Sequence, residues 1–203
     1  VVYVYYGNAG AAEQQNKAGV WSNGYKGVWH LADNAASAAV ADSSGTGNTG
    51  TNQANTSTKT AAGKVGNGLT FNGSSDWVSI ASSASLGSGL GSFTISAWVK
   101  KSSNSTVDAI VWHGDDIDWS GASYRFLTLT TGQIQYLVGN WNTGKNFKGS
   151  TIADTNWHYV TMTYDGTTLR GYLRNALAQR SLAGQWVREF IPVLVGRRAL
   201  CEL

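Results

Sequence analysis

The chain has little charge and little material for helices. Only 13% of its 203 residues are charged, against about 25% in an average soluble domain. Methionine occurs once, and glutamate occurs only as Glu13, Glu189 and Glu202, so long amphipathic helices are not expected. Glycine (25), tryptophan (9) and tyrosine (9) are abundant instead, which favours half-buried strands joined by tight turns. We therefore expect an all-β chain, for which one sandwich of about 200 residues is a common size.

Cysteine and long hydrophobic runs are also scarce. The lone Cys201 excludes an internal disulfide framework and a thiolate metal cluster, and it leaves the redox compartment open. No run approaches the roughly 18 consecutive apolar residues of a membrane helix, so we expect no membrane insertion. The chain begins at Val1 with strand-like sequence and no initiator methionine. We expect it to be a piece of a longer protein whose signal peptide lies upstream.

The positive charge is concentrated near the C-terminus. Residues 1–165 carry nine basic and ten acidic groups, whereas residues 166–203 carry six arginines and two glutamates. A basic tail can bind nucleic acid or acidic surfaces. These arginines are spread over strand-like sequence without the motifs of known nucleic-acid modules, so we expect no nucleic-acid partner. We interpret the excess as a feature of an atypical end rather than as evidence for an acidic partner.

Short runs of alternating polar and apolar residues predict strands along most of the chain. They lie at 1–9, 27–31, 68–71, 77–80, 92–100, 109–112, 124–129, 133–138, 157–164, 168–173 and 192–197. Asp165-Gly166 joins two of them and is the strongest hairpin signal. A short helix is expected within 11–17, and the polar segment 42–59 predicts a long loop. This order predicts an antiparallel two-sheet β-sandwich of jelly-roll type.

Several motifs in a fixed order point to one family. They lie at 28–31 (Val-Trp-His-Leu), 42–50 (Asp-Ser-Ser-Gly-Thr-Gly-Asn-Thr-Gly), 63–73, 75–78, 92–100 and 157–166. Over residues 27–198 the chain thus resembles the concanavalin A-like lectin/glucanase superfamily, in its laminin-G-like (LamG) branch of bacterial secreted proteins. The resemblance implies a LamG sandwich at 21–203. Residues 1–20 are expected to be an N-terminal strand and connector that end a preceding domain.

The chain departs from the family pattern near its C-terminus. Residues 172–176 lack the glycine of a family turn, and the sequence stops after 196–198, where the family adds a last strand. A missing strand exposes the hydrogen-bonding edges of its two neighbours. We expect either Val1–Tyr6 or a second copy of the chain, in a homodimer, to pair with that open edge.

Two loops are candidates for binding sugar, whose C–H faces stack on aromatic rings and whose hydroxyls bond to Asp, Asn and His. In 112–119 two tryptophans bracket a histidine and three aspartates, and the turn-rich loop 140–146 carries one tryptophan. The alternative is that the first tryptophan packs in the core and the aspartates only stabilise a turn. The predicted ligand-binding residues are Trp112, His113, Asp115, Asp116, Trp119, Trp141 and Asn142.

The other tryptophans and histidines of the strand-like runs are assigned to the core. Trp77, Trp98 and Trp157 lie in alternating strand patterns, so we expect them to be buried. His30 and His158 lie inside strands next to apolar residues, where a structural histidine is the more common outcome.

The polar loop 42–48, with Asp33 upstream, resembles the loop that helps to hold a structural calcium ion in many LamG domains. Calcium takes about six to eight oxygen ligands, which flexible loops supply well. The resemblance implies one structural calcium ion with Asp42 as the main ligand and Asn48 and Asp33 as further ligands. The alternative is an Asx turn at Asp42 without a metal ion.

An enzymatic role has a weaker basis in the sequence. The catalytic branches of the superfamily carry a run such as Glu-x-Asp-x-x-Glu, and no such run occurs here. Glycosidases need two carboxyl groups about 5–9.5 Å apart. The nearest pair is Asp116 and Asp118, which an extended segment would place on one face. A serine hydrolase is not expected, because no Gly-x-Ser-x-Gly elbow occurs.

Three functions fit these observations. The first is a non-catalytic, lectin-like carbohydrate-binding module of a larger extracellular protein, secreted or at the cell surface, that binds a polysaccharide by stacking and hydrogen bonds. The second is a glycoside hydrolase acting on β-glycans with Asp116 and Asp118 as its carboxylate pair. The third is a structural or adhesion spacer that binds nothing.

Overall fold

The structure is a computed structural model that describes residues 9–10, 12, 15–86, 91–114, 124–139 and 145–175. These ranges contain two short helices and a series of strands, all paired antiparallel. The helices are α1 (Lys17–Val20) and α2 (Thr56–Lys59), and the strands are β1 (Ala39–Val40), β2 (Gly50–Asn52), β3 (Thr60–Ala62), β4 (Asn67–Leu69), β5 (Val78–Ile80), β6 (Phe93–Val99), β7 (Asp108–His113), β8 (Tyr124–Thr128), β9 (Gln133–Val138), β10 (Lys145–Thr151), β11 (His158–Tyr164) and β12 (Leu169–Asn175).

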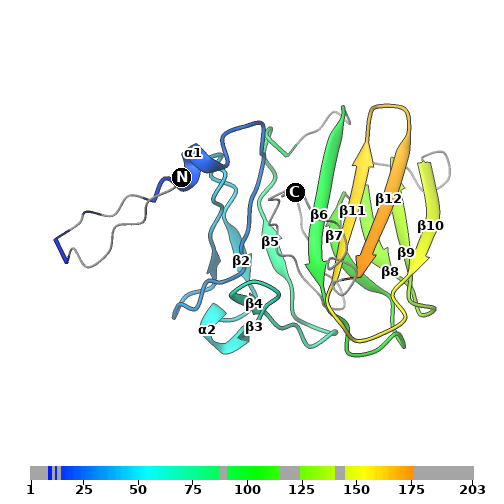
Figure 1. Ribbon diagram of the computed structural model, residues 1–203, viewed down its shortest axis with the longest axis horizontal. Coiled ribbons are helices and arrows are strands. Elements are labelled where there is room, and N and C mark those ends of the chain that lie inside the picture. Colours follow the sequence, from blue (N-terminus) through cyan, green and yellow to red (C-terminus); the bar gives the residue numbers. More distant parts are fainter. Residues whose placement is uncertain are drawn as a thin grey trace, which may run out of the picture.

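Strands β6 to β12 form a two-sheet sandwich (Figure 1). One sheet has the order β10-β9-β8-β7 and the other the order β12-β11-β6. Alternate residues of each strand point inward, so Ala97 and Val99 of β6 and Met162 of β11 pack against Phe126 and Ile134 of the other sheet. This cluster is the main core. The all-β, antiparallel two-sheet sandwich predicted from the sequence is therefore confirmed.

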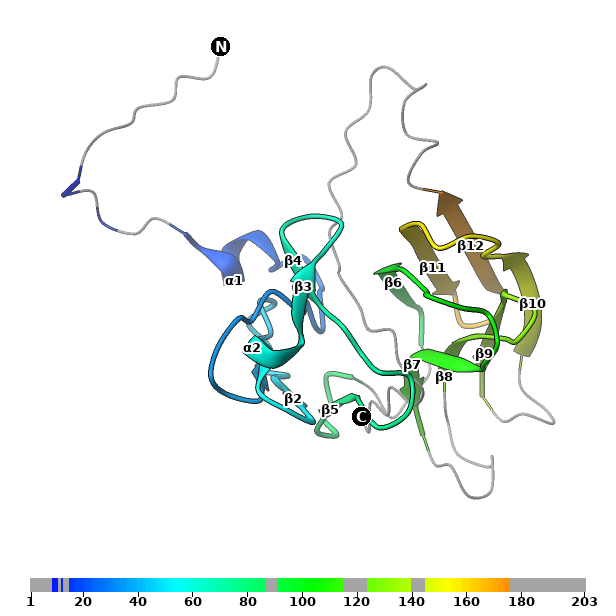
Figure 2. The ribbon, with the colours of Figure 1, turned by 90° about the horizontal axis from the view of Figure 1, so that it is seen from below.

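Residues 17–86 form a smaller set of elements beside the sandwich (Figure 2). A three-stranded sheet, β1-β2-β5, and a separate β3–β4 hairpin surround a second core cluster. Leu31, Val40 and Val78 are buried there, with Trp29 packed against them. The described ranges contain no helix that is long and apolar enough to cross a membrane, because α1 and α2 have four residues each.

Most predicted strands of the sandwich are confirmed to within two residues at each end, and the Asp165-Gly166 turn joins β11 to β12 as predicted. The predicted strand 27–31 is wrong, because Trp29 makes only an isolated bridge, to Asp42. The Val28 N–H donates to the Asp42 carboxylate and the Val28 C=O accepts from the Ser43 N–H, so Val28 bonds to the polar loop instead of to a sheet. The predicted loop 42–59 is also too long, because it contains β2 and α2.

Strand β10 was not predicted, because the run Lys-Asn-Phe-Lys-Gly-Ser-Thr holds a single large apolar residue, Phe147. The predicted helix within 11–17 is not confirmed, because α1 begins only at Lys17 and the described residues 12, 15 and 16 are not helical. Residues 1–8 and the predicted strand 192–197 lie outside the described residues, so the division at residue 20 and the pairing of the open edge stay predictions. Among the described strands, β6 pairs only with β11.

Candidate functional site

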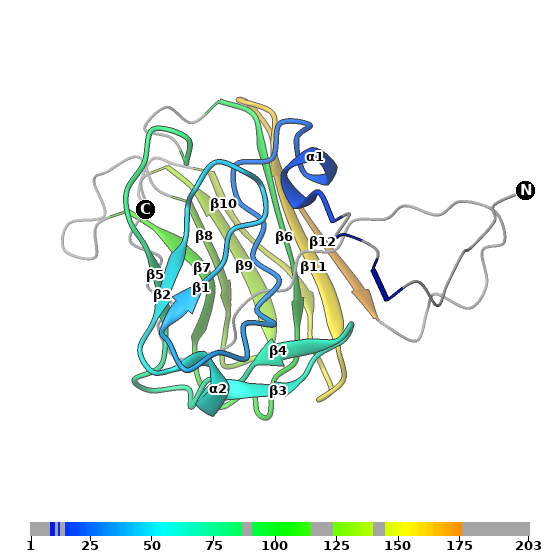
Figure 3. The ribbon, with the colours of Figure 1, turned by 90° about the vertical axis from the view of Figure 1, so that its left-hand side faces the viewer.

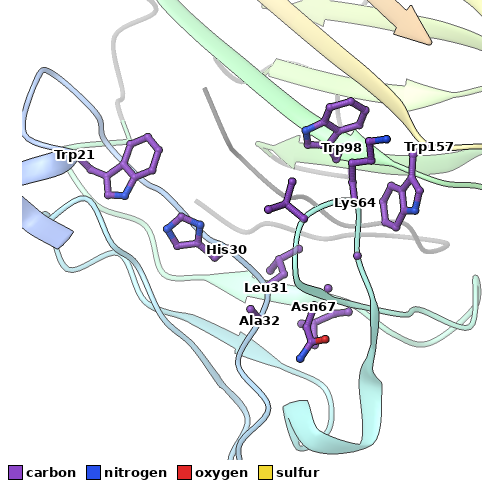
Figure 4. Close-up of a pocket in the computed structure, with 12 residues that line it drawn as sticks. Trp21, His30, Leu31, Ala32, Lys64, Asn67, Trp98 and Trp157 are labelled. Carbon is purple, nitrogen blue, oxygen red and sulfur yellow. The ribbon is translucent and has the colours of Figure 1, made fainter. Parts of the chain in front are cut away.

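A pocket of about 360 Å³ lies where the smaller set of elements meets the sandwich (Figure 4). That volume is within the range of roughly 300–1,000 Å³ that is usual for small-ligand sites. The lining is mostly aromatic and apolar, with one lysine and one asparagine. The described residues that line it are Trp21, His30, Leu31, Ala32, Gly63, Lys64, Val65, Asn67, Gly68, Leu69, Trp98 and Trp157.

The sandwich contributes Trp98 and Trp157 to this pocket. Along β6 the residues Ala97 and Val99 face the core, so Trp98 between them faces outward. The register pairs Trp98 with Tyr159 of β11, and their ring centroids are 5.2 Å apart. Trp157 lies two residues before Tyr159 and lines the same pocket. Aromatic side chains thus gather on the outer face of the β12-β11-β6 sheet.

The β3–β4 hairpin covers the other side of Trp98. In Figure 3 this hairpin crosses in front of one end of β6 and β11. Its turn contains Gly66 at a φ of 64°, a conformation that favours glycine. The turn places the Lys64 ammonium 5.4 Å from the centroid of the Trp98 ring, which is within cation–π range. Trp98 itself is only 8% exposed, so Trp157, which is half-buried, offers the more accessible ring.

Trp21 and His30 form the opposite end of the pocket, as Figure 4 shows. Their ring centroids are 5.7 Å apart, and Tyr25 packs edge-on against Trp21 at 5.2 Å. Burial lowers the pKa of His30, and the positive charge of Lys17 lowers it further, whereas Asp33 raises it. The lowered pKa favours the neutral ring, which can donate one hydrogen bond and accept one.

The backbone at Leu31 is strained next to this end of the pocket. Leu31 has a φ of 55°, a left-handed conformation that is rare for a bulky residue. Its side chain is 2% exposed and packs against Val40 and Val78, which holds the backbone in place. Strain of this kind costs about 1–3 kcal/mol and tends to occur at binding sites. The two neighbours of Leu31 in the sequence, His30 and Ala32, line the pocket.

Only part of the site predicted from the sequence can be placed. The predicted residues Asp115, Asp116, Trp119, Trp141 and Asn142, and Asp118 of the alternative catalytic pair, lie outside the described residues.

Trp112 and His113 end β7, and neighbouring groups cover both rings. The Arg125 guanidinium lies 3.8 Å from the centroid of the Trp112 ring, and His113 stacks on Tyr124 at 4.6 Å. A sugar ring could not stack on the faces that Arg125 and Tyr124 occupy. The predicted role of Trp112 and His113 in ligand binding stays a prediction.

Asp42 organises the polar loop that was predicted to hold calcium. Its carboxylate accepts hydrogen bonds from the backbone N–H groups of Val28, Ser44 and Asn48, each at 2.9 Å. The bond from Ser44 closes the Asx turn that was the alternative prediction. Burial alone would raise the pKa of Asp42, but the hydrogen bonds from Ser44 and Val28 outweigh it, so the pKa is lowered.

The other two predicted calcium ligands are also engaged with protein donors. The Asn48 side-chain oxygen accepts a hydrogen bond from Ser83 at 2.8 Å, and the Asp33 carboxylate accepts one from the Ala41 N–H at 2.9 Å. No group of three or more potential metal-binding side chains occurs within the described ranges. These oxygens already accept hydrogen bonds from protein donors, and calcium binding stays a prediction from the resemblance alone.

Among the pocket residues, sequence reasoning assigned Trp98 and Trp157 to the core and His30 to a structural role; Trp157 is only half-buried. Trp98 is buried as expected, but it lies outside the cluster between the sheets. Its position in β6 carried a usable signal, because Thr94 and Ser96 share its alternation and Ala97 and Val99 do not. No comparable signal existed for Trp21 and His30, which reach the pocket only through the tertiary fold.

His158, the other predicted structural histidine, is 3% exposed, and its Nε2 lies 2.7 Å from the Asp154 carboxylate. Trp77 is half-buried beside β5.

A comparison with known families gives one match. A laminin-G family model, described as the concanavalin A-like lectin/glucanases superfamily, matches residues 71–199, which is more than half of the chain. The matched range includes Trp98 and Trp157, but not Trp21, His30 or the β3–β4 hairpin. No curated protein and no solved structure matches the chain.

Proposed function

Because the chain belongs to the concanavalin A-like lectin/glucanases superfamily, we propose that it is a non-catalytic carbohydrate-binding module of a larger extracellular protein, and that it binds a polysaccharide in the tryptophan-lined pocket. The family supports a lectin-like role in general. The pocket supplies a specific place for it.

The observation that carries the proposal is the convergence of Trp21, Trp98 and Trp157 on one pocket. Sugar rings have apolar C–H faces that pack on indole rings, so exposed tryptophan surface is an effective platform. His30 and Asn67, from the same lining, can bond to the ring hydroxyls as both donors and acceptors. A concave, mostly apolar and aromatic lining with a few polar groups is the usual composition of a ligand site.

The pocket favours binding over hydrolysis. A glycosidase needs two carboxyl groups at its cleavage point, and among the described residues that line the pocket there is no Asp or Glu. The alternative pair, Asp116 and Asp118, belongs to a segment outside the described residues. The experiment below therefore measures cleavage as well as binding.

The test is affinity gel electrophoresis of the chain against a panel of β-glucans, xylans, galactans and pectins, with reducing ends assayed in the same polymers after incubation, followed by titration calorimetry on the polymer that retards it. Trp157→Ala and Trp21→Ala should each weaken binding about tenfold or more, which corresponds to about 1.4 kcal/mol. The matched control is Trp112→Phe, which keeps an aromatic ring over Arg125 and should leave binding unchanged. Thermal unfolding of each variant verifies that it folds.

Each outcome assigns one function. Loss of binding in the Trp112 variant alone would move the site to the strand-end loop predicted from the sequence. Release of reducing ends, abolished by Asp116→Asn, would make the chain a glycoside hydrolase instead. No retardation on any polymer, with the protein folded, would favour the spacer.

A further inference from the structure

We propose that the ligand of this pocket is an acidic polysaccharide, whose carboxylate or sulfate groups pair with Lys64, which lies over Trp98, and with Arg174, which lies beside Tyr159. This inference rests on the proposed glycan-binding function and adds the chemical class of the glycan.

Arg174 lies in the same cross-strand row as the pocket tryptophan. Tyr159 of β11 pairs with Trp98 of β6 on one side and with Arg174 of β12 on the other. Directly opposed residues of neighbouring strands point to the same face, with Cβ atoms about 4.5–5.5 Å apart. The outer face of this sheet therefore carries an aromatic pair with an arginine beside it. Arg174 is exposed, so its guanidinium is accessible to a ligand.

Lys64 supplies a second cation, which lies over the tryptophan of this row. Its ammonium lies over Trp98 at 5.4 Å, and in Figure 4 its side chain lies between Trp98 and Trp157. Among the described residues that line the pocket, Lys64 is the one that carries a positive charge. A lysine at a tryptophan-lined wall provides an ammonium for an anionic substituent of a sugar that packs on the neighbouring ring.

Neither cation has a carboxylate partner in the described part of the chain. The ion pairs there join Lys59 to Asp76, Lys101 to Asp108, His158 to Asp154, and Arg170 to Asp165.

Two further aspartates accept hydrogen bonds from backbone N–H groups: Asp42 accepts from Val28, and Asp33 accepts from Ala41. Asp33 is close enough to His30 to affect its pKa, so it lies near the end of the pocket away from Lys64. The row from Lys64 to Arg174 thus carries a net positive charge, to which an anionic ligand can pair without displacing an internal partner.

An acidic glycan suits this surface better than a nucleic acid. Nucleic-acid binding draws its affinity from many phosphate contacts made by several cations, and this row offers two. A glycan chain with one charge per one or two sugar rings can stack a ring at Trp157 and reach both cations. Single-stranded DNA is therefore a competitor in the test, and binding of DNA in preference to the glycans would overturn the inference.

The experiment compares polymers that differ only in charge. Polygalacturonate is titrated beside its fully methyl-esterified form, and dextran sulfate beside dextran, by calorimetry at low salt. Wild type should bind at least one charged polymer about fivefold or more tighter than its neutral counterpart. A preference for polygalacturonate over its methyl ester would indicate a carboxylate ligand, and a preference for dextran sulfate over dextran would indicate a sulfate ligand. Raising the salt to 0.5 M, a concentration that screens exposed charges, should remove most of the preference.

Lys64→Gln and Arg174→Gln should each reduce the preference about threefold, as expected for one exposed ion pair, and the double variant should abolish it. The matched control is Lys148→Gln, an exposed lysine on β10 of the other sheet, which should leave the preference unchanged. Equal affinity for charged and neutral polymers, or a loss of preference in the Lys148 variant as large as in the Lys64 variant, would overturn the acidic-glycan inference.

The same data separate the two proposals. Binding of neutral polymers that Trp157→Ala abolishes and Lys64→Gln leaves intact would refute the acidic ligand and keep the glycan-binding pocket. Failure of every polymer to bind, or binding that is indifferent to Trp157, would refute the pocket itself.

Discussion

Trp98 and Tyr159 stand opposite each other on β6 and β11, with their ring centroids 5.2 Å apart and their ring planes at 49°. They lie on the outer face of their sheet, where the strand alternation would otherwise place polar residues such as Ser96. Trp98 therefore lines the candidate pocket beneath Lys64 of the β3–β4 turn, and it lies outside the core cluster of the sandwich.

Replacement of Tyr159 tests whether this pair shapes the pocket. Tyr159→Ala removes the ring that holds Trp98 in place, and we expect ligand affinity to fall severalfold and stability by about 1 kcal/mol, the usual size of an aromatic pair. A double-mutant cycle with Trp98→Ala, measured by calorimetry and urea unfolding, reports the coupling. Strictly additive effects of the two substitutions on affinity would mean that Tyr159 does not position Trp98.

Asp42 should stabilise the loop at neutral pH and lose that effect in acid. Its pKa is lowered in the folded state, so its contribution is complete above about pH 4, its usual range, and falls as the pH drops toward the lowered value. Asp42→Asn should cost about 2 kcal/mol at pH 7, because an amide keeps only part of the acceptor capacity. Urea unfolding at pH 7 and pH 3 measures this, and the cost should shrink at pH 3.

The same loop gives a test of metal dependence. Because protein donors already bond to the oxygens of Asp42 and Asn48, we expect the thermal midpoint to be equal in 5 mM EDTA and in 5 mM calcium chloride. A calcium-dependent rise in the midpoint that Asp42→Asn removes would establish the calcium site implied by the family resemblance.

Gly171 should tolerate no side chain. A Cβ atom there would lie 2.3 Å from two carbons of the Tyr136 ring, which is stacked between Phe126 and Phe147 in the core and has little room to move. We expect Gly171→Ala to cost about 2 kcal/mol, as overpacking of a core usually does. Gly68→Ala is the control, because its Cβ would meet only an ordinary contact at 3.6 Å. Equal midpoints for the two variants would contradict the packing described.

His30 should titrate below its usual range, because burial and then Lys17 lower its pKa. Protonation of His30 therefore opposes folding, and stability should decline as the pH falls below about 6.5. Lys17→Gln should raise the pKa toward the usual value, which NMR titration of the His30 ring measures. The rings of His113 and His158 provide internal references, and an equal shift in all three would exclude a local effect of Lys17.

The amino-acid sequence by itself determined the sandwich. Alternation along segments such as 133–138 and 158–164, and the Asp165-Gly166 turn, encode strand and hairpin locally, because side-chain period and turn conformation depend on neighbouring residues. The Asx turn at Asp42 is local in the same way. The weakly patterned β10 escaped prediction, because pairing with β9 rather than its own composition makes it a strand.

Only the tertiary structure decided where the candidate site lies. Trp21, Lys64 and Trp157 are far apart in the sequence, and each looks like an ordinary surface or core residue there. They line one pocket because the β3–β4 turn places Lys64 over Trp98 of β6, and Trp21 and the segment at His30 and Leu31 line the same space. Arg174 acquires a role in the same way: a charge that looked like part of a basic tail lies, through the register with Tyr159, in line with Trp98. Contacts between distant segments have no local pattern, so the sequence could indicate the family and the fold but not this site.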